Sequence, residues 1–147
     1  MSDIVFNIAK GKAAYLAGLP ATNDALILVP LESSGLVSDA TMRDYDTLAA
    51  ILAGATNEQT TIGRKTLANV TVTVDDTNDR VDVDADDVTY TAATGSAVGA
   101  VVICYDPDTT GGTDADLIPL VKLDAVFTPS GNDVELGFAS GGLYRAS

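Results

Sequence analysis

The segment from Val70 to Tyr90, VTVTVDDTNDRVDVDADDVTY, constrains the fold of this chain more than any other. Apolar and polar residues alternate in two runs, and a short polar turn separates the runs. Successive side chains of a β-strand point to opposite faces. The expected apolar face carries Val81, Val83 and Ala85, and the expected acidic face carries Asp82, Asp84 and Asp86. The pattern predicts an antiparallel hairpin with one solvated, acidic face, which is typical of β-rich surface or assembly proteins.

The composition predicts one domain with an aliphatic core. The chain has 147 residues, enough for a sizeable core and usual for a single domain. Hydrophobic residues make up 46% of it, but only 5% are aromatic and Trp is absent, so Val, Leu, Ile and Ala must fill the core. We expect a single β-rich domain over residues 1–147, in which Met1–Lys12 is either the first strand or an arm that lies along a neighbouring molecule.

The chain is strongly acidic, with a formal net charge of −13. Nucleic-acid phosphates and anionic lipids repel such a chain unless it has a local basic patch. The basic residues are scattered, and the pair Arg64–Lys65 is their longest cluster. We therefore expect no nucleic-acid partner and no membrane partner. We also expect neither a signal peptide nor a membrane-spanning segment.

The absence of histidine excludes most familiar catalytic arrangements. Ser–His–Asp and Cys–His catalysis, the usual zinc sites and a histidine pH switch all need that side chain. The single cysteine, Cys104, stands in the apolar run VVICY and is expected to be a buried strand residue that forms no internal disulfide. Neither Lys12 nor Lys65 has a visible apolar cage that would support lysine catalysis. We expect no enzymatic activity, no catalytic residues and no cofactor.

Short apolar runs between turn signals predict a mainly β fold with one helix. The helix is expected to begin near Ser38 and to end near Gly54, because apolar residues recur there at three- and four-residue spacing. Pro30 suggests an edge position or a bulge, and Pro119 suggests an edge strand. The expected strands are Ala25–Glu32, Thr66–Val74, the run after the turn, Val88–Thr91, Val98–Tyr105 in the sheet centre, Leu117–Thr128, and Val134–Ala139 paired back through a PSGND turn. This spacing favours a small antiparallel β-barrel or β-sandwich.

The loop Asp106–Asp116, DPDTTGGTDAD, is the best candidate for a ligand site in the sequence. Calcium prefers carboxylate oxygens, and the loop matches an EF-hand at positions three, six and nine. Position twelve is Leu117 where a bidentate Glu belongs, and no helix is expected on either side. Asp side chains also cap ordinary turns through their own backbone. The turn interpretation is favoured and no metal ligand is assigned, although calcium binding by the loop stays open.

A second acidic cluster runs from Asp75 to Asp87. A glycosidase needs two carboxylates opposed across a cleft, whereas neighbours on one strand face point the same way. A solvated face that discourages edge-to-edge aggregation explains the cluster without catalysis. The alternative is docking onto the basic surface of a partner, which charge complementarity would accelerate.

The opening MSDIVFNIAKGK, the middle LVSDATMRDYDTLAAILA, the two Asp-rich segments and the terminal GGLYRAS resemble small virion proteins of tailed bacteriophages. The resemblance spans nearly the whole chain, and the Asp-rich segments are its most distinctive parts. It implies a capsid decoration (cement) protein that binds the outer face of the capsid lattice as a homo-oligomer, with a trimer favoured. The implied partner is the major capsid protein or another virion protein, and the implied location is the virion, after synthesis in the cytoplasm of the host bacterium.

A different structural role in the same particle is the alternative: a tail, baseplate or head-fibre component, including a host-recognition module. Recognition modules usually expose aromatic side chains, and this chain has five Tyr and three Phe. An enzyme with paired carboxylates is the third and least favoured class.

Overall fold

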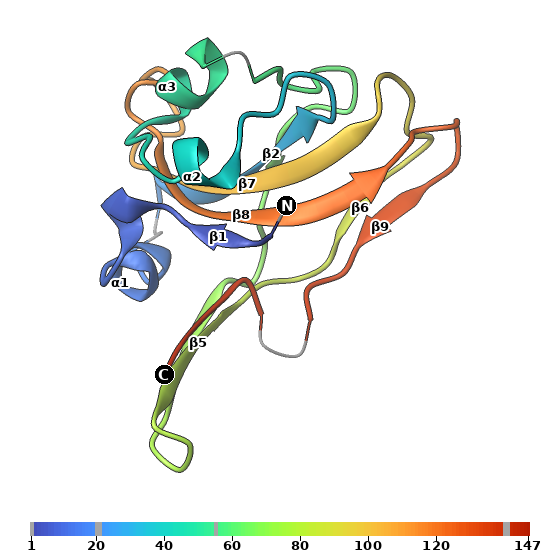
Figure 1. Cartoon of the computed structure of the whole chain (residues 1–147). Coiled ribbons are helices and arrows are strands. Elements are labelled where there is room, and N and C mark those ends of the chain that lie inside the picture. Colours follow the sequence, from blue (N-terminus) through green and yellow to red (C-terminus); the bar gives the residue numbers. More distant parts are fainter. Residues whose placement is uncertain (1, 20–21, 55, 140–141) are drawn as a thin grey trace.

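The computed structural model describes residues 2–19, 22–54, 56–139 and 142–147. The fold is mainly β, with antiparallel sheets and short helices, as the sequence predicts (Figure 1). The largest sheet lies above two small sheets, which is a sandwich-like arrangement, and the strands within the described ranges form no closed barrel.

The large sheet has five strands. In spatial order they are β1 (Ile4–Val5), β8 (Ile118–Phe127), β7 (Val98–Asp106), β2 (Ala25–Glu32) and β3 (Lys65–Thr66). All nine residues of β7 are buried, which confirms the prediction that Val98–Tyr105 lies in the centre of the sheet. A strand covered on both faces reads as a continuous apolar run, and this is the pattern of β7 and of β2.

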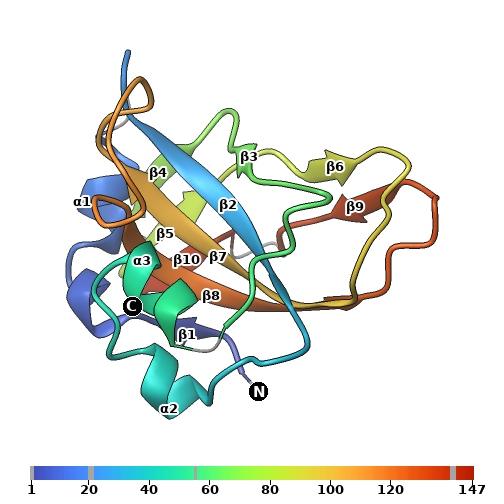
Figure 2. The same cartoon turned by 90° about the horizontal axis from the view of Figure 1, so that it is seen from above.

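Short helices cover the large sheet. Helices α2 (Asp39–Met42) and α3 (Leu48–Ala53) lie over one face, whereas α1 (Ala13–Ala17) lies on the other side, preceded by the 3₁₀ turn η1 (Asn7–Ala9) (Figures 1 and 2). Phe6 is fully buried and the amide of Phe6 donates to the carbonyl of Leu120, so the start of the chain packs along its own β8.

The predicted single helix over Ser38–Gly54 is wrong, because the structure has two helices there. Ser38 accepts a hydrogen bond from the amide of Thr41 and caps α2. Thr47 accepts one from the amide of Ala50 and starts α3 anew. Ser and Thr side chains compete for backbone groups in this way and favour helix starts over helix interiors. Of the predicted apolar stripe, Met42 and Leu48 have no exposed surface and Tyr45, Ala49 and Leu52 are half-buried, whereas Ile51, which lies outside the stripe, is also fully buried.

Two prolines interrupt the large sheet without lying on its edges. Strand β2 lies between β7 and β3, and β8 lies between β1 and β7, so the predicted edge positions are wrong. The register of β2 with β7 shifts between Leu31 and Glu32, just after Pro30. The register of β7 with β8 shifts where Cys104 meets Pro119. Irregular ladders of this kind tolerate a residue that lacks an N–H, so the bulge interpretation of Pro30 holds.

The small sheets come from segments far apart in the sequence. One contains β10 (Tyr144–Ala146), β5 (Arg80–Asp84) and β4 (Thr71–Asp75), and the other contains β6 (Val88–Tyr90) and β9 (Val134–Leu136). Pairing of β4 with β5 confirms the predicted hairpin. Residues 134–139 were expected to pair back with Leu117–Thr128, but β9 pairs with β6 instead. Gly131 turns at φ 86°, and residues 92 and 93 bond to residues 131–133, which carries the chain across to β6.

Candidate interaction site on a projecting β-arm

The sheet of β10, β5 and β4 projects from the rest of the chain as a separate arm (Figure 1). We call β4, the turn 76–79, β5 and β10 the β-arm. The two strands of the hairpin come from the alternating run, and the third strand comes from the end of the chain. Because the β-arm projects from the rest of the chain, both of its faces are exposed except where another element packs against them.

Strand register assigns each side chain to one face of the β-arm, because residues directly opposite each other share a face. Tyr144 pairs with Val83 and Ala146 pairs with Val81. The apolar face carries Val72, Val74, Val81, Val83, Tyr144 and Ala146. The polar face carries Thr71, Thr73, Asp75, Arg80, Asp82, Asp84 and Arg145.

The apolar face is covered at its base and open toward its tip. Val83 is 2% exposed and belongs to the main core, and α1 packs against β4 and β5 on this side. Val72 is 38% exposed and Val74, closer to the turn, is 66% exposed. The end of the β-arm therefore presents apolar surface to the outside.

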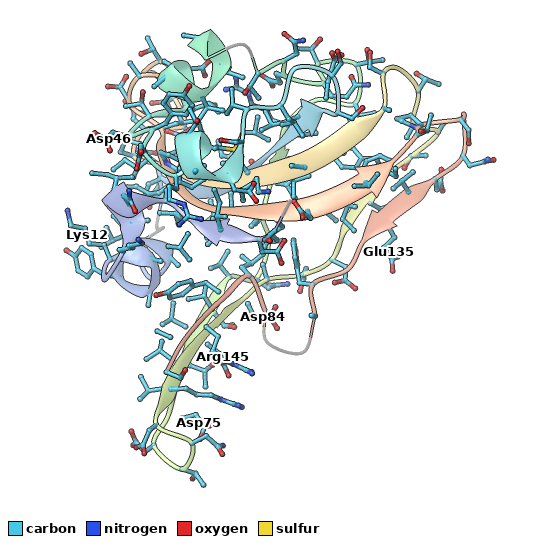
Figure 3. The ribbon with its side chains drawn as sticks, in the orientation of Figure 1. Lys12, Asp46, Asp75, Asp84, Glu135 and Arg145 are labelled. Atoms are coloured by element: carbon cyan, nitrogen blue, oxygen red, sulfur yellow. The ribbon has the colours of Figure 1, made fainter. Side chains whose placement is uncertain are left out.

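The polar face is less acidic than the sequence predicts. Asp82 lies between two arginines, with 3.1 Å from Arg80 Nε to its Oδ2 and 2.5 Å from Arg145 Nε to its Oδ1. The hydrogen bond from Arg145 holds the pKa of Asp82 below its usual value, and the same bond raises the pKa of Arg145. Figure 3 shows Arg145 on the β-arm between Asp75 and Asp84. Sequence reasoning missed this cation, because 63 residues separate Arg145 from Asp82.

Further carboxylates lie at the tip, where Asp75 is also 3.1 Å from Nε of Arg80. Asp75 caps its own turn: its carboxylate accepts hydrogen bonds from the amides of Thr77 and Asn78 and from the side-chain amide of Asn78. The side-chain bond from Asn78 is the main cause that lowers the pKa of Asp75. Asp76 and Asp79 are exposed beside it. The tip thus combines open valines on one face with exposed carboxylates at the turn.

The Asp106–Asp116 loop uses its carboxylates to hold its own backbone. Asp108 accepts hydrogen bonds from the amide and the hydroxyl of Thr110, which lower its pKa. Asp116 Oδ2 accepts from the amide and the hydroxyl of Thr113, and Asp106 accepts from the amide of Asp108. The ordinary turn chemistry of aspartate explains these residues.

The fourth carboxylate of the loop, Asp114, serves the packing of the body. Arg64 donates to it at 2.6 Å and to Glu58 at 2.7 Å, which ties two loops together over one side of the large sheet. The hydrogen bond from Arg64 lowers the pKa of Asp114. Across the described ranges, no three acidic or cysteine side chains gather closely enough to hold a metal ion.

The body contains one charged group that sequence reasoning overlooked. Lys122 has no exposed side-chain surface, and its ammonium group donates to Asp39 at 2.8 Å and to Asp124 at 2.7 Å. The Lys122 hydrogen bond is the main cause that lowers the pKa of Asp39. A fully paired lysine of this kind is a structural group, and its position in an apolar strand run gives no sign of its partners.

Cys104 is fully buried in β7, as the sequence predicts, and burial raises the pKa of its thiol.

The chain matches no protein-family model, and comparisons with curated proteins and with solved structures found no significant match. None of the helices in the described part of the chain has the length and apolar character needed to cross a bilayer. Function must therefore be argued from the residues and their geometry.

Proposed function

We propose that this chain is a structural protein of a tailed-phage virion, and that it decorates the outer face of the capsid lattice. The observation that carries the proposal is the β-arm, whose apolar face opens toward a tip with Val74 66% exposed. Its partner is the major capsid protein or another virion protein. The proposed activity is binding through the β-arm, without a catalysed reaction.

The β-arm has the surface of a docking element. β-Branched apolar side chains on a projecting element gain stability when a partner removes them from water, by about 25 cal/mol per Å² of apolar surface. The exposed carboxylates of Asp76 and Asp79 beside them favour a partner whose surface is basic around an apolar centre. Many identical copies on a lattice supply avidity, so a small contact per copy is sufficient.

The acidic side chains of the described residues support a structural role over a catalytic one. The carboxylates of both Asp-rich segments mostly cap turns or pair with arginine, as at Asp75, Asp82 and Asp108. A catalytic pair would need two carboxylates opposed across a cleft. The resemblance of the sequence to small virion proteins points to the same structural class.

A tail, baseplate or head-fibre component, including a host-recognition module, is the second candidate. Tyr15, which is 69% exposed on α1, is the observation that favours it, because exposed aromatic rings suit carbohydrate and protein recognition. Among the described residues it is the one large aromatic side chain with such exposure. A single ring is a weak recognition surface, so decoration remains the better-supported function.

The test is the copy number of this chain in purified particles from the producing cell, measured by quantitative mass spectrometry relative to the major capsid protein. We expect a ratio near one, or near a simple fraction set by the lattice. A ratio of a few per cent or less would move the protein to the tail, baseplate or fibres. Its absence from particles would refute a structural role in the virion.

A further inference from the structure

Strand β4 has a free edge. It ends the order β10–β5–β4, so the outer side of Thr71–Asp75 has no partner strand within the described residues. Alternate residues of such an edge present unpaired N–H and C=O groups to the outside. At five residues, β4 is longer than any other strand that ends a sheet here, since β1 and β3 have two residues and β6, β9 and β10 have three.

The β4 edge lacks the features that normally prevent edge pairing. Proteins protect exposed edges with charges, prolines, bulges or very short strands. Residues 70–74 read VTVTV, with neither charge nor proline, and the register of β4 with β5 is regular from Thr71 to Asp75. Its neighbour β5, in contrast, carries Asp82 and Asp84. Of the two hairpin strands, β4 is the one at the end of the sheet, and its one charged residue, Asp75, lies at the turn end of the strand.

We propose that β4 pairs antiparallel with β4 of a second copy of this chain, about a two-fold axis at Thr73. Pairing of identical edges in this way is isologous and closes at two copies. The result is one continuous six-stranded sheet made of two β-arms. The inference concerns this chain alone and does not depend on the proposed function.

The choice of register follows from the side chains. With Thr73 on the axis, Val72 lies opposite Val74 of the partner subunit, which gives two valine pairs on one face. Cross-strand pairs of β-branched residues stabilise a sheet. Thr71 lies opposite Asp75 of the partner subunit, so no two acidic groups face each other directly. A shift by one residue would place the apolar faces of the two β-arms on opposite sides.

A hollow at the base of the β-arm fits the same register. It has a volume of about 560 Å³ and lies between α1, the start of β2 and the start of β4, with Gly18, Asn69 and Val70 in its wall. Asn69 and Val70 would lie opposite residues 77 and 76 of the second copy. The turn at the tip of one β-arm thus has space beside the base of the other.

Net charge opposes this pairing and should make it depend on the salt concentration. Each copy has a formal net charge of −13, so two copies repel each other, and dissolved salt screens this repulsion. The contact itself is uncharged between residues 70 and 74. We therefore expect association to strengthen as salt is raised from about 0.05 to 0.5 M.

The experiment is disulfide trapping of the purified chain. Thr73→Cys places two thiols opposite each other at the axis, whereas Thr71→Cys, an exposed threonine on the same face, places them far apart. The native Cys104 is buried and does not compete. Under mild oxidation at high salt we expect the Thr73→Cys chain to form a covalent dimer of about twice 15.0 kDa, at least ~10-fold faster than the Thr71→Cys chain.

Sedimentation of the wild-type chain at about 100 µM and high salt complements the trapping. We expect a dimer, and we expect Thr73→Lys to dissociate it, because two lysines would then face each other at the axis. The matched variant Thr89→Lys, on the exposed side of β6, should leave the dimer intact. A monomer under these conditions, a trimer, or equal trapping of the two cysteine variants would overturn the proposal.

Discussion

The ammonium group of Lys122 and the carboxylate of Asp39 lie 2.8 Å apart, although 83 residues separate them in the sequence. The lysine side chain has no exposed surface, and the carboxylate of Asp39 also accepts a hydrogen bond from the backbone N–H of Ser2 at 2.7 Å. This contact joins the start of the chain, the start of α2 and the middle of β8 in one cluster.

Asp39→Ala should destabilise the chain by about 2 kcal/mol, because a buried ammonium group would retain Asp124 as its one carboxylate. The figure is below the usual range for fully buried pairs, since Asp39 is 20% exposed. Urea unfolding at pH 7 measures it. Asp46→Ala, at an exposed carboxylate near α3, is the control and should change the free energy of unfolding by less than about 0.5 kcal/mol. Equal effects of the two variants would contradict the assigned role of Asp39.

Stability should fall in acid and stay level near neutrality. The folded-state pKa values of Asp39, Asp82, Asp108 and Asp114 lie below the ordinary 3.8, because each carboxylate accepts hydrogen bonds from the fold. Groups with depressed pKa values contribute stability that is present above about pH 4 and lost as pH falls through the folded values.

Denaturant midpoints measured at pH 7, 5 and 3 test this expectation. We expect equal midpoints at pH 7 and 5, because the chain has no histidine to titrate between them. A lower midpoint should appear at pH 3. A midpoint that rises at pH 3 would contradict the depressed pKa values.

Gly142→Ala should weaken the attachment of β10 to the β-arm. Gly142 has φ 68°, and a Cβ there would overlap the backbone carbonyl of Val83. The cost should exceed about 2 kcal/mol, because backbone must move to relieve the overlap. Gly131→Ala is the matched control: its φ is 86° but nothing lies within 4 Å, so strain alone should cost about 1 kcal/mol. Thermal unfolding of both variants measures the difference.

Val74→Asp should reduce binding to capsids if the β-arm is the docking element. Adding a carboxylate to its open apolar face removes apolar contact and leaves a charge to be buried, so we expect at least a ~10-fold loss of affinity. Val126→Asp, at a valine on β8 that is 81% exposed, is the control and should bind as the wild type does. Co-sedimentation with particles that lack this chain is the measurement. Unchanged binding of Val74→Asp would show that another surface docks.

The thiol of Cys104 should not react in the folded chain. It is fully buried, and burial raises its pKa, so the reactive thiolate is scarce at pH 7–8. Ellman's reagent should label it after addition of guanidinium chloride and not before. Rapid labelling of the native chain would mean that β7 opens to solvent.

The sequence predicted the elements whose pattern is local. The alternation of valine with aspartate and threonine predicts the hairpin of β4 and β5, because in a strand it places the valines on one face and the polar residues on the other. Continuous apolar runs predicted β2 and β7, because strands covered on both faces have no solvent side to mark with polar residues. For the helical region, the predicted stripe included the buried Met42 and Leu48 but not the buried Ile51, and the cap formed by Thr47 divided one helix into two.

Contacts between distant segments could not be read from the sequence. Nothing near Arg145 shows that it pairs with Asp82, and nothing near Lys122 shows that it meets Asp39. The predicted partner strand of β9 was wrong for the same reason, since a turn signal indicates where a strand begins and not which strand it pairs with.

The sequence by itself therefore determined the fold class, the hairpin and the aliphatic core, because side-chain periodicity follows directly from strand geometry. Only the tertiary structure decided that the hairpin projects as a β-arm, that the end of the chain supplies its third strand, and that most of the prominent aspartates are already bonded. These properties depend on which distant segments meet, and pairing between distant segments leaves no local pattern.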